Sequence, residues 1–323
     1  MDDPAVCPRK KVSLMVPFYN EEEVLPALFA GLQEFMDQHH EYDWEILMVN
    51  DGSTDGGLAG VMRMHAGDSR WRYVDLSRNF GKEAAMLAGL DYVTGDCVVI
   101  LDADLQDPPE VIDRMLELWR QGYDDVYGRR ITRGREPWLR RRFTMLYYSL
   151  LQRLTRVPVL QNVGDFRLLD RICIDALCRL RETQRYTKGL YCYMGFRKAE
   201  VLFDRGDRCG GHTKFSFMRL LSHAADGITS YTVMPLRVST FVGLGVSLFT
   251  FVYMIYFLVK SLIWGDDVQG FPTLIVVILF LGGTILLCLG ILGEYVGRIF
   301  NESKRRPPYF VREVDGKRPQ GKG

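Results

Sequence analysis

Short apolar runs and amphipathic runs alternate along the chain up to residue 130. The apolar runs end in polar residues and predict buried strands over 11–20, 44–50, 71–76, 97–101 and 124–128. The runs between them have helical spacing and predict helices over 21–38, 57–66, 81–93 and 109–120. Acidic residues are expected in the opening turn of the first helix. Strands that alternate with helices indicate an α/β fold with a doubly wound, mostly parallel sheet, which binds ligands at the carboxyl ends of its strands.

Two later segments carry no charged residue and are long enough to cross a bilayer. They occupy residues 238–259 and 268–293. A span of about 20 apolar residues crosses a membrane, so the pair predicts a transmembrane hairpin with helices at about 238–262 and 271–294. Two buried core helices are the alternative. Basic residues flank the outer ends of the pair, whereas the connection holds Asp266 and Asp267, so both termini are expected on the cytoplasmic side.

Amphipathic, basic segments lie between the predicted sheet and the hairpin. One is expected to form an interfacial helix at about 138–156, with an ordinary surface helix as the alternative. A second is expected just before the first span. The tail is basic and rich in Pro and Gly, which predicts loose order. These patterns divide the chain into four parts. They are a cytosolic catalytic domain (1–210), a closing loop with a juxtamembrane helix (211–236), the hairpin (237–298) and the tail (299–323).

Composition narrows the function classes. The 323 residues carry a formal net charge of +1, which gives no support for a nucleic-acid partner. The seven cysteines have no metal-ligand spacing and predict free thiols in a reducing compartment. The first residues lack the apolar core of a signal peptide.

Four acidic residues follow the fourth predicted strand in "VVILDADLQDPPE". Asp102 and Asp104 are two positions apart, so an extended chain puts their side chains on one side. Two carboxylates in this arrangement can share a Mg²⁺ or Mn²⁺ ion that completes its shell with substrate phosphates, and Gln106 can add a neutral oxygen. Solvated surface acids are the alternative for a lone DxD pair. Asp107 and Glu110 are expected at the start of the next helix.

Asp51, at the end of the second predicted strand, is the candidate anchor for a nucleotide. Its carboxylate can accept hydrogen bonds from a base or a ribose. A turn-forming role before Gly52 is the alternative, and both roles can hold together. Phosphate groups are expected to meet basic side chains, for which the candidates are Arg78, Lys82, Arg167 and Lys214. Lys82, at a helix start, suits a pyrophosphate best.

The sequence resembles the family 2, GT-A-fold glycosyltransferases, and within them the bacterial polyprenyl-phosphate (undecaprenyl-phosphate) glucosyltransferases; dolichyl-phosphate mannose synthases are similar in the first half. The resemblance runs in order along nearly the whole chain. It is carried by "VPFYNEEEVLP", "VNDGSTDGG", "LSRNFGKEAAMLAGLD", "LDADLQDPPEVI", "NVGDFRLLDR", "DGITSYTVMPLR", "ILFLGG" and "LGILGEYVGRIFNESKRRPPYFVRE".

The resemblance implies roles for matching positions. A nucleotide-sugar pocket would be lined by Pro17, Tyr19, Glu21 and Asp51. The metal would be held by Asp102 and Asp104, with Gln106 assisting. The sugar and the acceptor phosphate would lie beside Asp165 and Arg167, and a loop closing over the phosphates would carry Lys214. Catalysis would then rest on Asp165, Arg167 and Asp104. Two positions depart from the family pattern: Asn50, where a first Asp of "DDGS" is usual, and His212, where an acidic or small polar residue is common.

The expected reaction is inverting transfer of a hexose, favouring glucose from UDP-glucose, to polyprenyl phosphate in the bacterial inner membrane, for modification of cell-envelope glycans. GDP-mannose or a modified sugar nucleotide is the alternative donor. A non-catalytic membrane scaffold or flippase component is the alternative class. A homo-oligomer, dimer or tetramer, is plausible because small residues give the second span faces for close packing, although packing within the hairpin explains them nearly as well. These residues are Gly282, Gly283, Gly290, Gly293 and Gly297.

Overall fold

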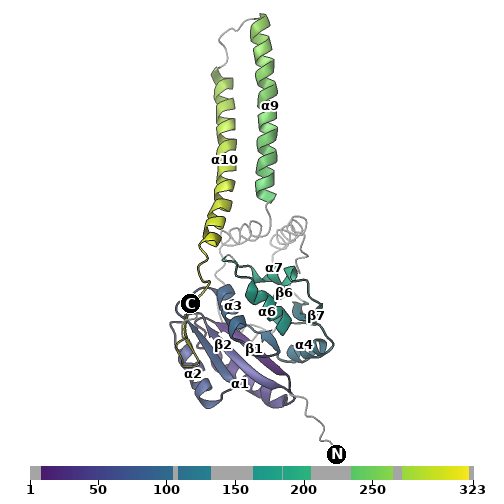
Figure 1. The fold of residues 1–323 in the computed structure, drawn as a ribbon, viewed down its shortest axis with the longest axis vertical. Coiled ribbons are helices and arrows are strands. Elements are labelled where there is room, and N and C mark those ends of the chain that lie inside the picture. The colour runs from purple at the N-terminus through teal and green to yellow at the C-terminus, as the bar shows by residue number, and fades with distance from the viewer. Residues whose placement is uncertain are drawn as a thin grey trace, which may run out of the picture. The chain divides into compact units, whose positions relative to one another are not determined.

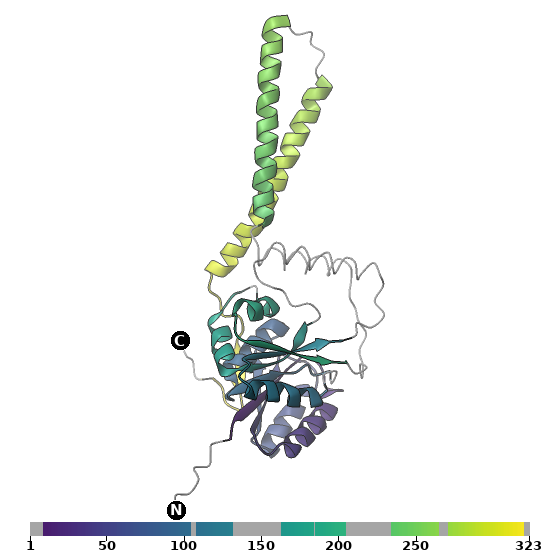
Figure 2. The same ribbon diagram turned by 90° about the vertical axis from the view of Figure 1, so that its right-hand side faces the viewer.

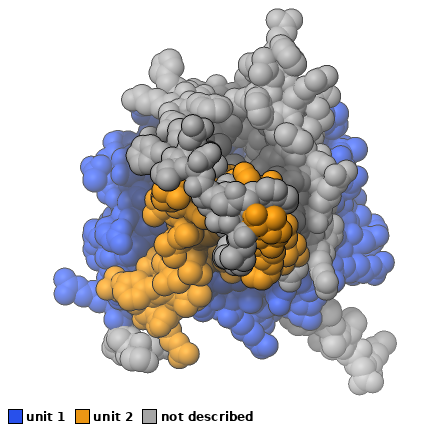
Figure 3. Space-filling view, turned by 90° about the horizontal axis from the view of Figure 1, so that it is seen from above, with its two compact units in different colours: residues 1–152, 156–215, 307–323 blue, residues 153–155, 216–306 orange. Residues whose placement is uncertain are grey.

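The structure is a computed structural model of the chain that describes residues 9–104, 108–131, 163–183, 185–204, 234–264 and 271–319. The chain divides into two compact units, coloured separately in Figure 3. The first comprises residues 1–152, 156–215 and 307–323, and the second comprises 153–155 and 216–306. The first unit holds the sheet, and the second holds two long helices (Figure 1). The predicted helices at 138–156 and within 211–236 lie outside the described residues.

One mixed sheet forms the first unit, with the strand order β7-β5-β6-β4-β1-β2-β3-β8 among the described residues. Its strands are β1 Lys11–Phe18, β2 Asp43–Asn50, β3 Trp71–Leu76, β4 Cys97–Ile100, β5 Asp125–Arg130, β6 Val163–Asp170, β7 Lys198–Phe203 and β8 Val311–Val314. Strands β4, β1, β2 and β3 are parallel neighbours. Strand β1 lies between β2 and β4, so the chain order reverses beside it, which is where doubly wound sheets bind ligands.

Helices cover both faces of this sheet (Figure 2). One core packs against α1 Leu25–Gln38, α2 Gly57–Gly67 and α4 Glu110–Arg120, and the other against α3 Lys82–Tyr92, α6 Arg171–Arg179 and α7 Thr187–Tyr193. Alternate strand residues enter opposite cores, as Leu14 and Met15 do in β1. Because both faces are covered, the strands read as continuous apolar runs. The predicted doubly wound, mostly parallel α/β fold is confirmed.

The fifth predicted strand is confirmed as β5, which is separated from β4 by β6, a strand antiparallel to both that the sequence pattern did not predict. One detail of the prediction is wrong. The first helix begins at Leu25, after a turn in which Glu21 O accepts the N–H groups of Val24 and Leu25. The acidic residues therefore precede the helix. Glu22 is engaged elsewhere, since its carboxylate accepts the Gly56 N–H at 2.8 Å.

The predicted loosely ordered tail is also wrong, because residues 311–314 form β8 on the edge of the sheet. Strand β8 pairs antiparallel with β3, with Val74 opposite Val314 and Asp75 opposite Glu313. Polar contacts fix the strand to its neighbour: Arg72 Nε donates to Asp315 Oδ2 at 2.8 Å, and Tyr73 Oη donates to Glu313. The chain that leaves the last long helix thus completes the sheet of the first unit.

The second unit contains α9 Met234–Trp264 and α10 Phe271–Ser303. At 1.5 Å per residue, each is about 45–50 Å long, which exceeds the ~30 Å hydrocarbon core of a bilayer. Within the described residues, Phe280–Ser303 is long and apolar enough to cross a membrane, since its most apolar 18 residues have a mean hydropathy of 1.7 and none of them is buried. Arg298 Nε donates to Glu294 Oε1, one turn earlier in α10, at 2.9 Å.

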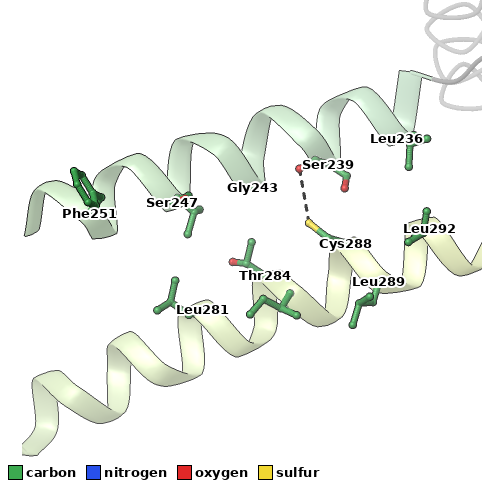
Figure 4. A pocket seen from close by; sticks show the side chains of 12 residues that line it. Leu236, Ser239, Gly243, Ser247, Phe251, Leu281, Thr284, Cys288, Leu289 and Leu292 are labelled. Carbon is green, nitrogen blue, oxygen red and sulfur yellow. Dashed lines mark hydrogen bonds between the residues drawn. The ribbon is translucent and has the colours of Figure 1, made fainter. Parts of the chain in front are cut away.

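Helices α9 and α10 enclose a groove of about 670 Å³ (Figure 4). Most of its lining is apolar, and its polar groups include Cys288, whose Sγ donates to Ser239 O at 3.7 Å. The glycines of α10 do not serve this packing. Among the described residues, a Cβ added at these glycines would meet no atom within 4 Å, at Gly282, Gly283, Gly290, Gly293 and Gly297. Close packing within the hairpin therefore does not account for them.

Candidate active site

A pocket of about 350 Å³ opens at the carboxyl ends of β1, β2 and β4. The structure brings together most of the residues predicted to bind the donor and the metal. Those that line the pocket are Pro17, Tyr19, Glu21, Asp51, Lys82, Asp102 and Asp104. Their roles as ligands of a nucleotide-sugar or a metal stay predictions, but their convergence on one pocket follows from the parallel strand order.

Asp51 follows β2 and is 4% exposed. Its Oδ1 accepts the Phe80 N–H at 2.7 Å, and its Oδ2 accepts the Gly81 N–H at 2.9 Å. Burial raises the pKa of Asp51, and these two N–H groups partly oppose the rise. Gly81 has φ +93°, in the left-handed region that favours glycine. Asp51 therefore fixes the loop before α3, a contact that the sequence did not predict, and its turn-forming role before Gly52 and its role in nucleotide binding both stay predictions.

Lys82 links the pocket residue Asp102 to Asp165, which does not line the pocket. Its Nζ lies 2.6 Å from Asp102 Oδ1 and 2.6 Å from Asp165 Oδ2. Burial lowers the pKa of Lys82, but the charges of Asp102 and Asp165 more than offset this and raise it above its ordinary value. The Lys82 ammonium thus supplies positive charge beside the DxD pair, and its predicted contact with a pyrophosphate stays a prediction.

Asp165, near the start of β6, is 13% exposed at its side chain. Its Oδ1 is buried and has no hydrogen-bond partner within the described part of the chain. Burial raises the pKa of Asp165, but Lys82 and Lys188 together bring it below its ordinary value of 3.8. Asp165 is therefore ionised at neutral pH.

Arg167 lies two residues further along β6 and is 1% exposed. Its Nη1 donates to Asp125 Oδ1 at 3.1 Å, and its guanidinium lies 3.4 Å from the ring centre of Tyr191. Lys198 adds a second cation 2.7 Å from Asp125. In the structure Arg167 contacts these buried groups rather than lining the pocket, so its predicted contact with an acceptor phosphate stays a prediction. Its Nε has no partner within the described residues.

The acidic wall of the pocket fits a divalent cation. Burial raises the pKa of Glu21, and the negative charges of Asp104, Asp55 and Asp102 raise it further. A bound cation would relieve this repulsion, and Mg²⁺ is often held by one or two carboxylates together with substrate phosphates. Within the described residues, no group of three or more acidic, His or Cys side chains is close enough to form a complete protein cage. The DxD pair is therefore the candidate ligand set.

Besides Asp165 and Arg167, which do not line the pocket, three further predicted site residues do not line it or lie outside the described residues. Arg78 is exposed, with its guanidinium 4.1 Å from the ring centre of Phe80. Gln106 and Lys214 lie outside the described residues, as does the departure at His212. Asn50, the other departure, is buried, and its amide donates to Asp75 Oδ1 at 2.8 Å. An Asp at position 50 would instead face the Asp75 carboxylate.

Sequence reasoning missed a cluster that supports Asp165. Glu83 accepts the Thr187 N–H at 3.1 Å and also the Thr187 hydroxyl. This contact connects the first turn of α3 to the first turn of α7, the helix that supplies Lys188. The charged Glu83 directly after Lys82 in "GKEAA" was a signal that its side chain makes a specific contact. Its partner, Thr187, is far away in the sequence and could not be predicted.

Sequence comparison places the chain in a family. A sequence profile described as "Glycosyl transferase family 2" matches residues 13–177. The chain belongs to glycosyl transferase family 2. A second profile, "GtrB C-terminal hairpin", matches residues 234–299, which cover most of α9 and α10. The family of the sheet domain and the hairpin architecture predicted from the sequence are confirmed, and the hairpin associates this family 2 glycosyltransferase with membranes.

Relatives match this glycosyltransferase along almost its whole length. An uncharacterized glycosyltransferase of Synechocystis is 42% identical over 306 residues, covering 95% of this chain and 96% of its own. The bactoprenol glucosyl transferase of Shigella phage SfV is 39% identical and covers 94% and 98%. Among solved structures, a Pyrobaculum calidifontis mannosyltransferase in complex with GDP-Man and Mn²⁺ is 15% identical, with a TM-score of 0.44 over 90% of this chain and 76% of its own.

Proposed function

We propose that this enzyme transfers glucose from UDP-glucose to a polyprenyl phosphate and so forms a lipid-linked sugar for modifying envelope glycans. The observation that carries the proposal is the full-length relation to enzymes named bactoprenol glucosyl transferase. The alignment with one of them, from Shigella phage SfV, covers 94% of this chain and 98% of the relative. The relation includes the membrane hairpin, which a soluble acceptor would not require.

The pocket of the sheet domain supplies a donor site for this reaction. Its volume of about 350 Å³ and its carboxylates suit part of a nucleotide-sugar with a bound cation. Asp102 and Asp104 would hold Mg²⁺ or Mn²⁺, which supplies charge neutralisation at the diphosphate when bound. Tyr19 and Asp51 would contact the nucleoside. Lys82 would move from its two carboxylates to the diphosphate oxygens.

The acceptor does not need a strong general base. A phosphate monoester has a second pKa of about 6, so it is largely an anion at neutral pH and can attack the anomeric carbon directly. Asp165 has a lowered pKa and is ionised, so we assign it the orientation of the sugar and the stabilisation of positive charge that develops on it. Base catalysis by Asp165 is the second candidate. Direct displacement would invert the anomeric centre and give a β-linked product from an α-linked donor.

The hairpin would hold the enzyme in the bacterial inner membrane with both termini in the cytoplasm. The distribution of basic residues around the spans supports this orientation. The α10 glycines, unused by packing within the hairpin, support self-association as a dimer or tetramer.

Transfer of labelled sugar by the purified full-length protein tests the proposal. UDP-glucose, UDP-galactose and GDP-mannose are compared with undecaprenyl phosphate as acceptor, with and without EDTA. We expect transfer from UDP-glucose, abolished by EDTA and restored by Mg²⁺ or Mn²⁺. Asp104→Ala should lose at least about 100-fold in kcat/KM, equivalent to about 2.7 kcal/mol. The exposed Asp37, remote from the pocket, gives the matched control Asp37→Ala.

Each part of the proposal has its own contrary result. Full activity after thorough chelation would overturn the metal assignment. Preference for GDP-mannose would replace the donor but keep the reaction. The absence of transfer from all three donors would favour the non-catalytic scaffold.

A further inference from the structure

Strand β8 adjoins the loop that forms one wall of the donor pocket. The Ser77 N–H donates to Phe310 O at 2.8 Å, and Arg312 Nη2 donates to Ser77 O at 2.9 Å. Both backbone groups of Ser77 are therefore held by the tail. Residues 77–81 then lead into α3, and Asn79 and Gly81 line the pocket.

A ring contact reinforces this link. Phe310 lies beside Phe80, with ring centres 6.3 Å apart. The backbone N–H of Phe80 is one of the two donors that hold Asp51. The tail thus supports, through one intervening residue, the loop that positions Asp51.

A second, polar route runs from β8 to the opposite side of the same pocket. Arg312 Nη1 lies 3.3 Å from Asp75 Oδ2, and Asp75 accepts the Asn50 amide. Asn50 Oδ1 accepts the Ser53 N–H at 3.0 Å, and Ser53 Oγ accepts the Asn20 N–H at 3.0 Å. Asn20 stands between Tyr19 and Glu21, which line the pocket. This series of hydrogen bonds joins the ends of β1, β2 and β3.

Asn50 suits this route because it donates on one side and accepts on the other. Asp75 is 2% exposed, and burial raises its pKa, while the Asn50 amide and the Arg312 charge oppose the rise. Arg312 is thus a cation that offsets the buried Asp75 carboxylate. No β8 residue lines the pocket, so any effect of β8 on ligand binding must act through other residues.

We infer that β8 is a positioning element of the donor site, with Arg312 and Phe310 as its positioning residues. The strand that follows the second membrane helix keeps the loops at 51–53 and 77–81 in the arrangement that receives the nucleotide. The inference rests on the proposed function in one respect, the identity of the ligand as a nucleotide-sugar. Its consequence is that nucleotide affinity depends on a segment remote in sequence from every pocket residue.

The test uses Arg312→Met in the full-length protein. Arg312 is 57% exposed, so this variant should fold. We expect the Kd for UDP and the KM for UDP-glucose to rise about three- to tenfold, since the change removes a charge-assisted contact to the buried Asp75 and a second one to Ser77 O. The kcat and the KM for polyprenyl phosphate should stay within about twofold. Arg312→Lys should restore part of the affinity, and Arg318→Met, in the same exposed tail, is the matched control.

Hydrogen exchange of the peptide that spans residues 77–82 supplies a readout that needs no ligand. We expect faster exchange there in Arg312→Met than in Arg318→Met, and an intermediate change in Phe310→Leu. If the wild type binds neither UDP nor GDP, the proposed function fails, and the exchange measurement alone decides the inference. Equal exchange and equal nucleotide affinity in the Arg312→Met and Arg318→Met proteins would overturn it.

Discussion

Replacing Lys82 by Met tests the electrostatics of the pocket most sharply. In the structure the ammonium lies 2.6 Å from both Asp102 and Asp165. The variant keeps a long apolar stem but removes the charge, so two carboxylates lose a common partner. Asp165 is the more affected, because its side chain is 13% exposed and its other oxygen has no partner within the described residues.

The size of the effect follows from these contacts. A hydrogen bond to a charged group contributes about 1.5–3 kcal/mol, and the upper part of that range applies to the more buried Asp165. The Lys82 side chain is 44% exposed, so solvent screening reduces the contribution from Asp102. If the same ammonium meets the diphosphate during the reaction, its loss should cost about 2–3 kcal/mol, which corresponds to about 30- to 160-fold in kcat/KM.

The pH dependence of activity and stability gives an independent test of the contact between Lys82 and Asp165. The pKa of Asp165 is below 3.8 in the wild type, so its ionised form stabilises the fold above that value, and this contribution is lost as pH falls through the lowered pKa. In Lys82→Met burial remains, the strongest opposing charge is gone and only Lys188 and Arg167 still oppose it, so the pKa of Asp165 rises. The acidic limb of the pH–rate profile should therefore move to higher pH, and the variant should lose stability as pH rises through the new value.

Initial rates of sugar transfer and thermal unfolding, both across pH, measure these effects in the full-length protein. Lys11→Met is the matched control, because Lys11 is 41% exposed and lies at the opposite end of β1. A Lys82→Met enzyme that keeps more than a third of the wild-type kcat/KM, with an unmoved acidic limb, would refute the reasoning.

Three further substitutions probe the scaffold, each in the full-length protein. Asn50→Asp should lower the free energy of unfolding by about 1–3 kcal/mol, because it removes a buried donor from Asp75 and sets a second carboxylate against it; thermal unfolding should show the loss shrinking at acid pH. Asp125→Asn should cost about 3–5 kcal/mol, since it leaves the charge of Arg167 buried without its counter-ion, and an unchanged melting temperature would contradict this. Gly81→Ala has room for its Cβ, so only the backbone penalty applies; at φ +93° and ψ 156°, a region that is essentially glycine-only, thermal unfolding should show a loss of about 1–3 kcal/mol, and an unchanged melting temperature would contradict this.

The main elements of the sheet domain could be predicted because their residues carry strong periodic patterns. Strands β1, β2 and β4 are buried on both faces and read as unbroken apolar runs. The convergence of Asp51 and Asp102 followed from parallel strand order alone. The hairpin could also be predicted from the sequence, since uncharged runs of that length are rare outside membrane-spanning helices.

Other features depended on long-range partners that local patterns do not encode. Strand β8 has the sequence VREV, four residues with two charges after a proline-rich stretch, so nothing local indicated an edge strand. The contacts of its charged side chains appear only once β3 is beside it. The antiparallel insertion of β6 and the contact between Lys82 and Asp165 could not be predicted for the same reason. Each joins segments that are far apart in the sequence and share no motif.

Mass spectrometry of the lipid product tests the central claim most directly. Purified full-length protein, UDP-glucose, Mg²⁺ and undecaprenyl phosphate are incubated, and the organic phase is extracted. The account predicts a new lipid that carries one hexose on its phosphate. Its amount should equal the amount of UDP released, and its cleavage should identify a β-linked glucosyl phosphate. Release of free glucose with unmodified lipid, or an unchanged lipid with no UDP released, would contradict it.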